Sequence, residues 1–346
     1  MSNPLADWTP PGDWLRITTI DAHTAGEPLR IVVDGVPPIP GDTMLARRRH
    51  ARTHLDHLRR LLMWEPRGHA DMYGCVLTPP VTDDGDVGVL FLHNEGYSTM
   101  CGHGIIALVS VGITTGMLRD AAARGEIRID TPAGRVTAVA DGEPGPGLRV
   151  TFRNVPSFVL ASGVEVDVPG LGGVVADVAF GGAFYAYVDA ARFGLELVPS
   201  EFASITDKGR RITSAVAQEI EVRHPSGDPD LGFLYGTIFV GPPHDAAHHS
   251  RNVCVFAEAE VDRSPTGTGV SGRLAIHHAR REIAMGDEIE VESSLGTTFT
   301  GRVVGTTAVG DVAAVVPEIG GTASITGAHE FLLDPGDPLA SGFLLR

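Results

Sequence analysis

The sequence predicts a strand-rich α/β protein built from two similar halves, and three observations carry this prediction. The chain of 346 residues is long enough to bury a large core and to form two domains. Its 43 glycines and 24 prolines are scattered between periodic segments, which indicates many tight turns. The third observation is an order of helix, strand, turn and strand that occurs in both halves of the chain.

The expected secondary structure starts with a β-hairpin. Apolar or alternating runs predict four strands in the first hundred residues, at 16–21, 29–34, 72–77 and 87–93. Residues 26–28 (Gly-Glu-Pro) supply the turn of the hairpin between the first two strands. Leucines at helical spacing, with arginines on the other face, predict one surface helix over 43–64 that ends before Pro66.

A glycine-rich turn opens a helix in each half of the chain. Residues 100–104 (Met-Cys-Gly-His-Gly) lead into an apolar helix that reaches residue 118, and residues 265–269 (Pro-Thr-Gly-Thr-Gly) lead into one that reaches residue 281. A strand, a turn and a second strand follow each helix, at 127–130, 131–134 and 135–140 in the first half and at 288–292, 293–296 and 297–304 in the second. This order indicates two copies of one unit.

The spacing within the two copies is also similar. Asp130 follows Cys101 by 29 residues, and Glu292 follows Thr266 by 26. A duplication that faces two helix starts toward each other creates a site at the domain junction. The seam is expected near residue 150, within the Gly/Pro-rich segment 141–148.

We therefore expect two domains, each with one of the two turns. The N-terminal half, residues 1–150, carries Cys101, and the C-terminal half, residues 151–326, carries Thr266. A strand-like segment near residue 330 indicates that residues 327–346 return to the first half.

The composition favours a small molecule as the partner of this chain. The formal net charge is −16, whereas nucleic acids and anionic membranes are bound by clustered positive charge. Cys75, Cys101 and Cys254 are too few and of odd number for a disulfide framework, and they fit a reducing compartment. We see no signal-peptide pattern at the N-terminus, and the longest apolar stretch, 104–118, is too short to cross a bilayer. We expect a cytoplasmic protein.

The two turns differ in one reactive group, a thiol at Cys101 and a hydroxyl at Thr266. Unpaired N–H groups and the positive end of the helix dipole make each helix start an anion site. A substrate carboxylate between the turns would accept hydrogen bonds from the N–H groups of Gly102, His103, Gly267 and Thr268. The same field is expected to lower the pKa of Cys101, so that its thiolate can remove a proton from the carbon next to the carboxylate. The alternative is that Cys101 is a small buried hydrophobe.

Other motifs give weaker signals. Two histidine groups superficially resemble metal ligands, His50, His54 and His57 in one and His244, His248 and His249 in the other. The first group lies among arginines, which is typical of a solvated helix face, and the second lies in a proline-rich loop, where we expect a packing role. Residues 267–269 (Gly-Thr-Gly) lack the lysine of a P-loop. We expect neither a metal nor a nucleotide.

Four motifs together resemble the proline racemase family, and the resemblance covers nearly the whole chain. They are residues 21–28 (Asp-Ala-His-Thr-Ala-Gly-Glu-Pro), 65–69 (Glu-Pro-Arg-Gly-His), 93–104 around Cys101 and 262–269 around Thr266. The resemblance implies two mirrored, pseudo-symmetric domains of the diaminopimelate-epimerase type. Each would be a curved, mostly antiparallel sheet around a central helix, with catalysis in the interdomain cleft and without a cofactor.

The resemblance also implies roles for individual residues. Cys101 would be the base, and Asp262 would bind the ring nitrogen of the substrate. The residues assigned to the substrate carboxylate are Gly102, His103, Gly267 and Thr268. Without the resemblance, we would interpret Asp262 as a carboxylate in a turn that pairs with its neighbour in the sequence. Tyr185 and Phe256 could wall the pocket, although aromatic residues in apolar runs are more often plain core.

The pair of Cys101 and Thr266 separates two reactions within the family. Inversion of a stereocentre needs a proton-transfer group on each face of the substrate, and threonine cannot serve as the second base. Members with threonine in the second turn are similar to the dehydratases of trans-3-hydroxy-L-proline. In that substrate the α-hydrogen and the hydroxyl lie on one ring face, so a single thiolate could drive syn elimination to Δ1-pyrroline-2-carboxylate and water, with Thr266 as a hydrogen-bonding spacer.

Two other functions remain open at this point. The first is a proline or 4-hydroxyproline racemase or epimerase that uses Thr266 or water for the second proton transfer. The second is a non-catalytic protein that binds imino acids in the same pocket. A homodimer is expected from the general frequency of symmetric pairs.

Overall fold

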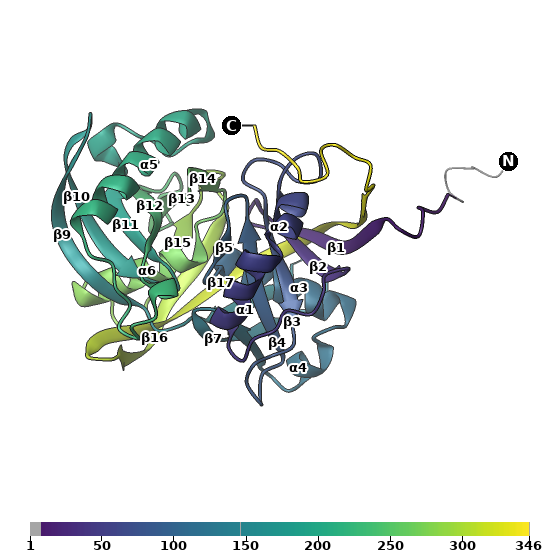
Figure 1. Ribbon diagram of the computed structural model, residues 1–346. Coiled ribbons are helices and arrows are strands. Elements are labelled where there is room, and N and C mark those ends of the chain that lie inside the picture. The colour runs from purple at the N-terminus through teal and green to yellow at the C-terminus, as the bar shows by residue number, and fades with distance from the viewer. Residues whose placement is uncertain (1–7, 146, 346) are drawn as a thin grey trace.

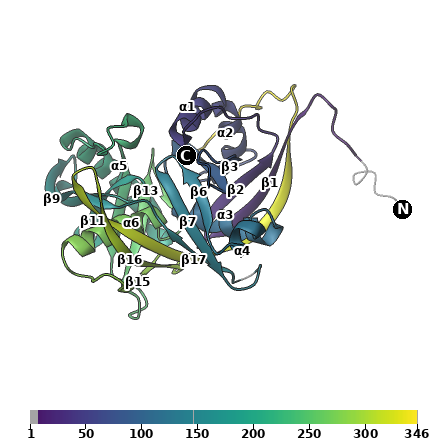
Figure 2. The same cartoon turned by 90° about the horizontal axis from the view of Figure 1, so that it is seen from below.

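The computed structural model describes residues 8–145 and 147–345. Its strands join in one hydrogen-bonded network that wraps around two buried helices, one in each lobe (Figures 1 and 2). The first lobe contains β1 (Leu15–Thr24), β2 (Glu27–Asp34), α1 (Met44–His54), α2 (Asp56–Met63), β3 (Tyr73–Thr78), β4 (Val87–His93), β5 (Tyr97–Ser98), α3 (Gly102–Thr115), α4 (Arg119–Ala123), β6 (Ile127–Thr131), β7 (Gly134–Asp141) and β8 (Arg149–Arg153).

The second lobe follows along the chain. It contains β9 (Phe158–Val168), β10 (Gly172–Phe180), β11 (Phe184–Asp189), η1 (Ala190–Phe193), η2 (Pro199–Glu201), α5 (Phe202–Glu219), η3 (Pro229–Leu231), β12 (Leu234–Gly241), β13 (Ser250–Phe256), β14 (Glu260–Asp262), α6 (Gly267–Ala279), β15 (Glu288–Glu292) and β16 (Thr298–Val309). The last strand, β17 (Val312–Leu333), contacts both lobes.

The two lobes repeat one pairing scheme, which confirms the pseudo-symmetric α/β fold expected from the sequence. In the first lobe, β2 pairs parallel with β3, β3 antiparallel with β4, β4 parallel with β6, and β6 antiparallel with β7. In the second lobe, β11, β12, β13, β15 and β16 pair in the same order and the same senses. The expected hairpin of β1 and β2 is also present.

A buried helix forms the centre of each lobe. Every residue from Gly102 to Ile113 of α3 is buried, and so is every residue from Gly267 to Ile276 of α6. α3 packs on β1, β8 and β17, whereas α6 packs on β9, β10, β16 and β17. A helix that is apolar on all sides is stable only when it is surrounded in this way, so both helix starts are fixed by the core.

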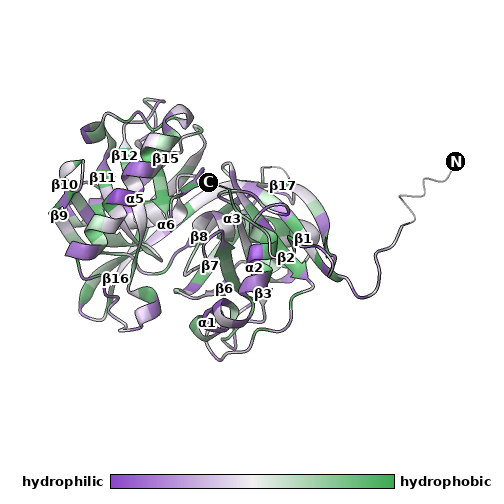
Figure 3. Cartoon of the chain, turned by 45° about the horizontal axis from the view of Figure 1, so that its top comes forward, coloured by the Kyte–Doolittle hydropathy of each residue, from purple (hydrophilic) through white to green (hydrophobic). Residues whose placement is uncertain are grey.

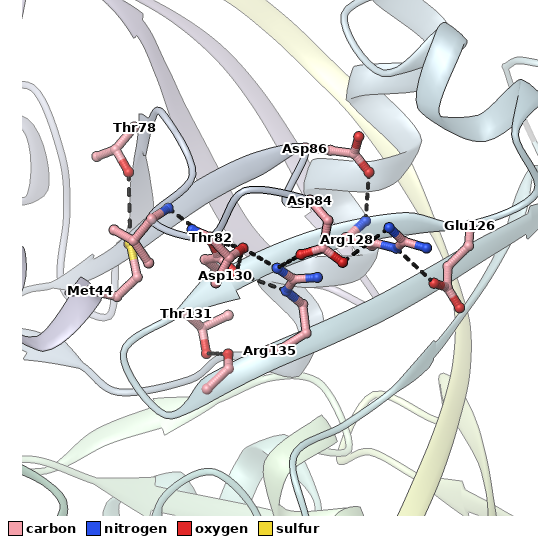
Figure 4. Close-up of polar contacts among 12 residues, drawn as sticks. Met44, Thr78, Thr82, Asp84, Asp86, Glu126, Arg128, Asp130, Thr131 and Arg135 are labelled. Atoms are coloured by element: carbon pink, nitrogen blue, oxygen red, sulfur yellow. Dashed lines mark hydrogen bonds and ion pairs between the residues drawn. The ribbon is translucent and has the colours of Figure 1, made fainter. Parts of the chain in front are cut away.

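A carboxylate at the end of β6 ties down the loop between β3 and β4. Asp130 accepts hydrogen bonds from the backbone N–H groups of Val81 and Thr82 and from Nε of Arg135, as Figure 4 shows for this cluster. Glu292, at the end of β15, accepts two backbone N–H groups of the corresponding β12–β13 loop. Asp130 and Glu292, whose similar distances from Cys101 and Thr266 indicate the repeat, therefore hold equivalent loops in the two lobes.

The strand β17 joins the two lobes. Its first part pairs with β16, its middle with β8, and its last part with β1. Figure 1 shows this strand in yellow, running from one lobe to the other. The segment near residue 330 thus lies against the first lobe, while the domain boundaries near residues 150 and 326 stay a prediction.

The prediction of a single helix over 43–64 is wrong, because the segment forms two helices. α1 and α2 are separated at Leu55, whose φ of −119° and ψ of 11° are not helical. The break turns the leucines of α2 onto the sheet, where Leu58, Leu61 and Leu62 are buried with Met63 in a small core of their own. Apolar burial therefore overrides the helical continuity that the spacing of the leucines indicates.

Hydrophilic residues cover the outer helices, such as α5, and hydrophobic residues follow the strands (Figure 3). Across residues 8–145 and 147–345, none of the helices combines the length and the apolar character that a bilayer crossing requires.

The two central helices meet end to end at a pair of glycines. A Cβ placed on Gly102 would lie 2.6 Å from Cα of Gly267, and a Cβ on Gly267 would lie 2.8 Å from Cα of Gly102. These are backbone contacts that cannot move aside like a flexible side chain. The close approach of the helix starts therefore requires glycine on both sides.

We expect that replacement of Gly102 by alanine forces the two helix starts apart. Overpacking of this kind lowers the free energy of unfolding by about 1–3 kcal/mol, which urea unfolding would measure. The matched control is Gly173→Ala in β10, where no atom lies within 4 Å of the added Cβ. A Gly102→Ala variant as stable as this control would contradict the contact.

Candidate active site

The two glycine-rich turns meet at a narrow cavity of about 20 Å³ between the lobes. The cavity is lined by Tyr73, Met100, Cys101, Gly102, His103, Tyr185, Tyr235, Cys254, Phe256, Asp262, Thr266, Gly267 and Thr268. The structure thus brings together all seven residues that the sequence nominated for the site. Tyr73, Met100, Tyr235 and Cys254 were missed, and Tyr185 and Phe256 were considered only as possible walls.

Cys101 occupies the position before the first residue of α3. Its backbone is extended, with φ −148° and ψ 111°, and its Sγ accepts a hydrogen bond from the N–H of Gly104 at 3.2 Å. The Sγ atom also lies 3.2 Å from Nδ1 of His103. The thiol therefore takes the place of a helix-capping oxygen at the edge of the cavity.

The expectation that the helix dipole lowers the pKa of Cys101 is wrong. Burial raises the pKa of this thiol well above its ordinary value, and the nearby carboxylate of Asp262 raises it further. The N–H of Gly104 acts in the opposite direction but does not compensate. Desolvation disfavours the thiolate more than one helix terminus favours it.

Thr266 holds the equivalent position before α6, but its conformation differs from that of Cys101. Its φ of 66° and ψ of 96° lie in a region that β-branched residues rarely adopt, at a typical cost of about 1–3 kcal/mol. Its hydroxyl is buried and lies near the Cys254 thiol, whose pKa it lowers slightly against a dominant rise from burial. Within the described residues, it makes no hydrogen bond of ordinary geometry.

His103 is buried directly below the thiol. Burial is the main influence on its ring and lowers its pKa, which favours the neutral imidazole. Its backbone carbonyl accepts a hydrogen bond from the hydroxyl of Thr24 in β1 at 3.0 Å. The first turn of α3 is thereby anchored to the sheet.

Two carboxyl groups from different lobes influence each other near the cavity, Asp262 in its lining and Glu27 outside it. Asp262 ends β14, and its Oδ1 accepts a hydrogen bond from the N–H of Ser264 at 2.7 Å. Glu27 begins β2, and its Oε2 accepts a hydrogen bond from the N–H of Arg263 at 2.7 Å. Burial first, and the charge of Asp262 second, raise the pKa of Glu27 well above its ordinary value. The neutral form of Glu27 is therefore favoured.

A second contact between the lobes lies behind the cavity. Nδ1 of His93, at the end of β4, lies 2.6 Å from Oε1 of Glu260 in β14, and both side chains are buried. The carboxylate also accepts the N–H of Asn94 at 3.3 Å. Together with the Glu27–Arg263 contact, this pair holds the lobes together around the cavity.

Aromatic side chains form one wall of the cavity. The rings of Tyr235 and Phe256 are 5.3 Å apart, and the ring of Tyr73 lies 6.1 Å from that of Phe256. The Tyr185 hydroxyl lies 2.9 Å from Oγ1 of Thr268, so it is engaged at the start of α6. Tyr73 follows the motif at 65–69 closely, so the sequence could have nominated it for the site. Tyr235 lies in an apolar strand, where no motif in the sequence points to a site residue.

The histidine groups set aside in the sequence lie away from this cavity. His50 and His54 stack on each other on α1, and Nδ1 of His248 lies 2.8 Å from Oε1 of Glu292. In the part of the chain that the structure describes, no three metal-binding side chains come together.

Comparison with known proteins agrees with the arrangement of the two turns. The family model described as "Proline racemase" matches residues 19–344. A trans-3-hydroxy-L-proline dehydratase of Bacillus cereus is 47% identical over 95% of this chain and 98% of its own. A 3-hydroxyproline 2-epimerase of Burkholderia multivorans is 45% identical over 95% and 98% of the two chains.

A solved structure is similar over the same length. The hydroxyproline epimerase of Agrobacterium vitis, crystallised with trans-4-hydroxy-L-proline, superposes with a TM-score of 0.88 at 32% identity and covers 96% of each chain. The sequence match, the structural match and the paired helix starts agree, and the chain belongs to the proline racemase family.

Proposed function

We propose that this protein dehydrates trans-3-hydroxy-L-proline to Δ1-pyrroline-2-carboxylate and water. The observation that carries the proposal is the unequal pair at the two helix starts, one thiol at Cys101 and one hydroxyl at Thr266. The name of the Bacillus cereus relative supports the same reaction. The protein is thus a hydro-lyase in this proposal.

The substrate carboxylate binds between the starts of α3 and α6. The first N–H groups of a helix have no partner inside the helix, and two helix dipoles point their positive ends at the same place. The N–H groups proposed to bind the carboxylate are those of Gly102, His103, Gly267 and Thr268. This position brings the α-carbon of the substrate between Cys101 and Thr266.

The charged ring nitrogen of the substrate binds Asp262, and this contact helps to form the thiolate. The negative charge of Asp262 is one of the causes that raise the pKa of Cys101. A cation bound at Asp262 cancels that effect, because opposite charges in contact compensate each other. Substrate binding therefore favours the base that the reaction needs.

Only one face of the bound ring meets a base. The thiolate of Cys101 removes the α-proton, and the 3-hydroxyl leaves from the same face, which makes the elimination syn. Thr266 cannot return a proton to the opposite face as a thiol can, so inversion is disfavoured. Loss of water makes the dehydration hard to reverse.

Epimerisation at the α-carbon is the second candidate, because one relative with 45% identity is named 3-hydroxyproline 2-epimerase. The two reactions are separated by their products from one substrate. Incubation with trans-3-hydroxy-L-proline yields the pyrroline in the first case and a diastereomer of the substrate in the second.

We propose a cytoplasmic location and a homodimer for this enzyme. Cys75, Cys101 and Cys254 are all free, which suits a reducing compartment. The homodimer rests on the frequency of two-fold symmetric pairs, and light scattering of the purified protein would test it.

Replacement of Cys101 by serine should abolish the dehydration. A general base contributes about 10²–10⁴-fold to a rate, and serine is too weak an acid to replace a thiolate. The measurement is pyrroline release from trans-3-hydroxy-L-proline. Cys75→Ala is the control, because Cys75 is buried in β3 outside the cavity and its loss should leave the rate unchanged. A Cys101→Ser variant that keeps a tenth of the activity would rule out this base.

Replacement of Thr266 by cysteine should add the missing second base. We expect the variant to invert the α-carbon of L-proline or 4-hydroxyproline, with deuterium incorporation when the reaction runs in D₂O. Chiral chromatography would detect the inversion, which only the cysteine variant should show, and mass spectrometry would show that the inverted product carries deuterium. Thr266→Ser is the control, because it keeps a hydroxyl and should not invert either compound. Absence of inversion in the cysteine variant would contradict the two-face argument.

Alkylation of the unliganded protein should show the raised pKa of Cys101. Because the thiolate is the reactive form, the iodoacetamide rate at Cys101 should keep rising with pH beyond about 8.5, the ordinary value of a free thiol. Peptide mass spectrometry locates the modified residue, and the planar carbanion analogue pyrrole-2-carboxylate should protect it. A rate that levels off below pH 8 would show that the helix start outweighs burial.

A further inference from the structure

The proposed dehydration includes one proton transfer, to the leaving 3-hydroxyl, whose path has not yet been assigned. When the thiolate of Cys101 takes the α-proton, the 3-hydroxyl must leave, and hydroxide is a poor leaving group unless a proton reaches it. The hydroxyl of Thr266 is on the opposite side of the ring. An acid is therefore needed on the face of the substrate that meets Cys101.

The Tyr73 side chain and the Cys101 thiol line the same cavity. Tyr73 begins β3 and is buried, and its hydroxyl lies 2.5 Å from Oγ of Ser98. Tyr73 also acts to lower the pKa of the thiol, although burial dominates. Tyr73 can therefore exchange a proton with Cys101 without crossing the cavity.

The Tyr235 hydroxyl comes from the other lobe, and its side chain lines the same cavity as Tyr73. It is buried in the cavity wall, and among residues 8–145 and 147–345 it has no hydrogen-bond partner of ordinary geometry. Tyr73 and the Cys101 charge are among the influences on its pKa, after burial. A buried donor without a partner costs free energy, and a substrate hydroxyl would satisfy it.

The other groups in the wall are not suited to this task. The Tyr185 hydroxyl is occupied by Oγ1 of Thr268, and Phe256 offers no proton. Burial raises the pKa of Tyr73 and of Tyr235 well above the ordinary value of a phenol. Both side chains are therefore neutral at physiological pH and hold a proton to donate.

We propose that Tyr73 and Tyr235 form a relay that carries the proton from the Cys101 thiol to the leaving 3-hydroxyl of the substrate. This proposal rests on the dehydration proposed above. In this relay, Tyr235 is the residue that recognises the 3-hydroxyl. The relay is needed for the dehydration but not for a simple exchange of the α-proton.

The steps of the relay balance. The thiolate takes the α-proton, the electrons of that C–H bond form the ring double bond, and the C–O bond breaks with its electron pair on oxygen. That oxygen takes the proton of Tyr235 and leaves as water. Tyr235 then takes a proton from Tyr73, which takes the proton from the Cys101 thiol. The thiolate and both phenols are restored, and no other reactant is consumed.

The test is the Tyr235→Phe variant, with Tyr97→Phe as the matched control. Tyr97 is also buried, but it lies outside the cavity and donates to the carbonyl of Ala51. Two rates are measured in D₂O, pyrroline release from trans-3-hydroxy-L-proline and deuterium incorporation at the α-carbon of L-proline. L-Proline has no 3-hydroxyl, so its exchange requires Cys101 but not the relay.

We expect Tyr235→Phe to lower pyrroline release by 100-fold or more and to leave the L-proline exchange within threefold of the unchanged protein. Unreacted trans-3-hydroxy-L-proline incubated with this variant should also gain deuterium at the α-carbon, because the carbanion is reprotonated when the hydroxyl cannot leave. The Tyr73→Phe variant should slow later turnovers more than the first, because the proton stays on the thiol. Tyr97→Phe should change neither rate.

Two outcomes would overturn the relay alone. One is pyrroline release by Tyr235→Phe within threefold of the unchanged protein. The other is a parallel loss of both rates, which indicates a general disturbance of the cavity. By contrast, unchanged protein that exchanges the α-proton but releases no pyrroline would contradict the proposed function itself, and the relay with it.

Discussion

The backbone contact between Gly102 and Gly267 is the constraint on which the site depends. It brings the positive ends of two buried helices to one point, where the unpaired N–H groups of both are desolvated. Such an arrangement is unfavourable when empty and favourable when an anion occupies it. The sheets, the inter-lobe pairs and the strand β17 can all be understood as the structure that holds these two helix ends together.

Around this symmetric centre the chemistry is asymmetric. Cys101 has an ordinary extended backbone, whereas Thr266 has a positive φ, so the second turn differs in shape as well as in reactivity. The carboxyl groups are unequal too, because burial and the neighbouring Asp262 favour the neutral form of Glu27. The two halves thus share the geometry of facing helices, whereas the residues before the helices, Cys101 and Thr266, make the two sides chemically different.

Local patterns predicted the hairpin and the two glycine-rich turns with their residues, because each depends on neighbours in the sequence, whereas Asp262 was assigned through the family resemblance. The break at Leu55 could not be predicted, since it depends on the core that α2 covers. The pKa of Cys101 was expected to fall because a helix start is visible in the sequence, whereas its burial is not. Tyr73 and Tyr235 meet across the lobes, so no local pattern connects them.

The long strand β17 also determines how the molecule comes apart. It supplies hydrogen-bond partners to β16 in one lobe and to β8 and β1 in the other. If either lobe unfolds, the remaining lobe keeps an unpaired strand edge and loses apolar cover on its central helix. The lobes are therefore thermodynamically coupled, and we expect the chain to lose its structure in one cooperative transition, although its pattern is that of two repeated units.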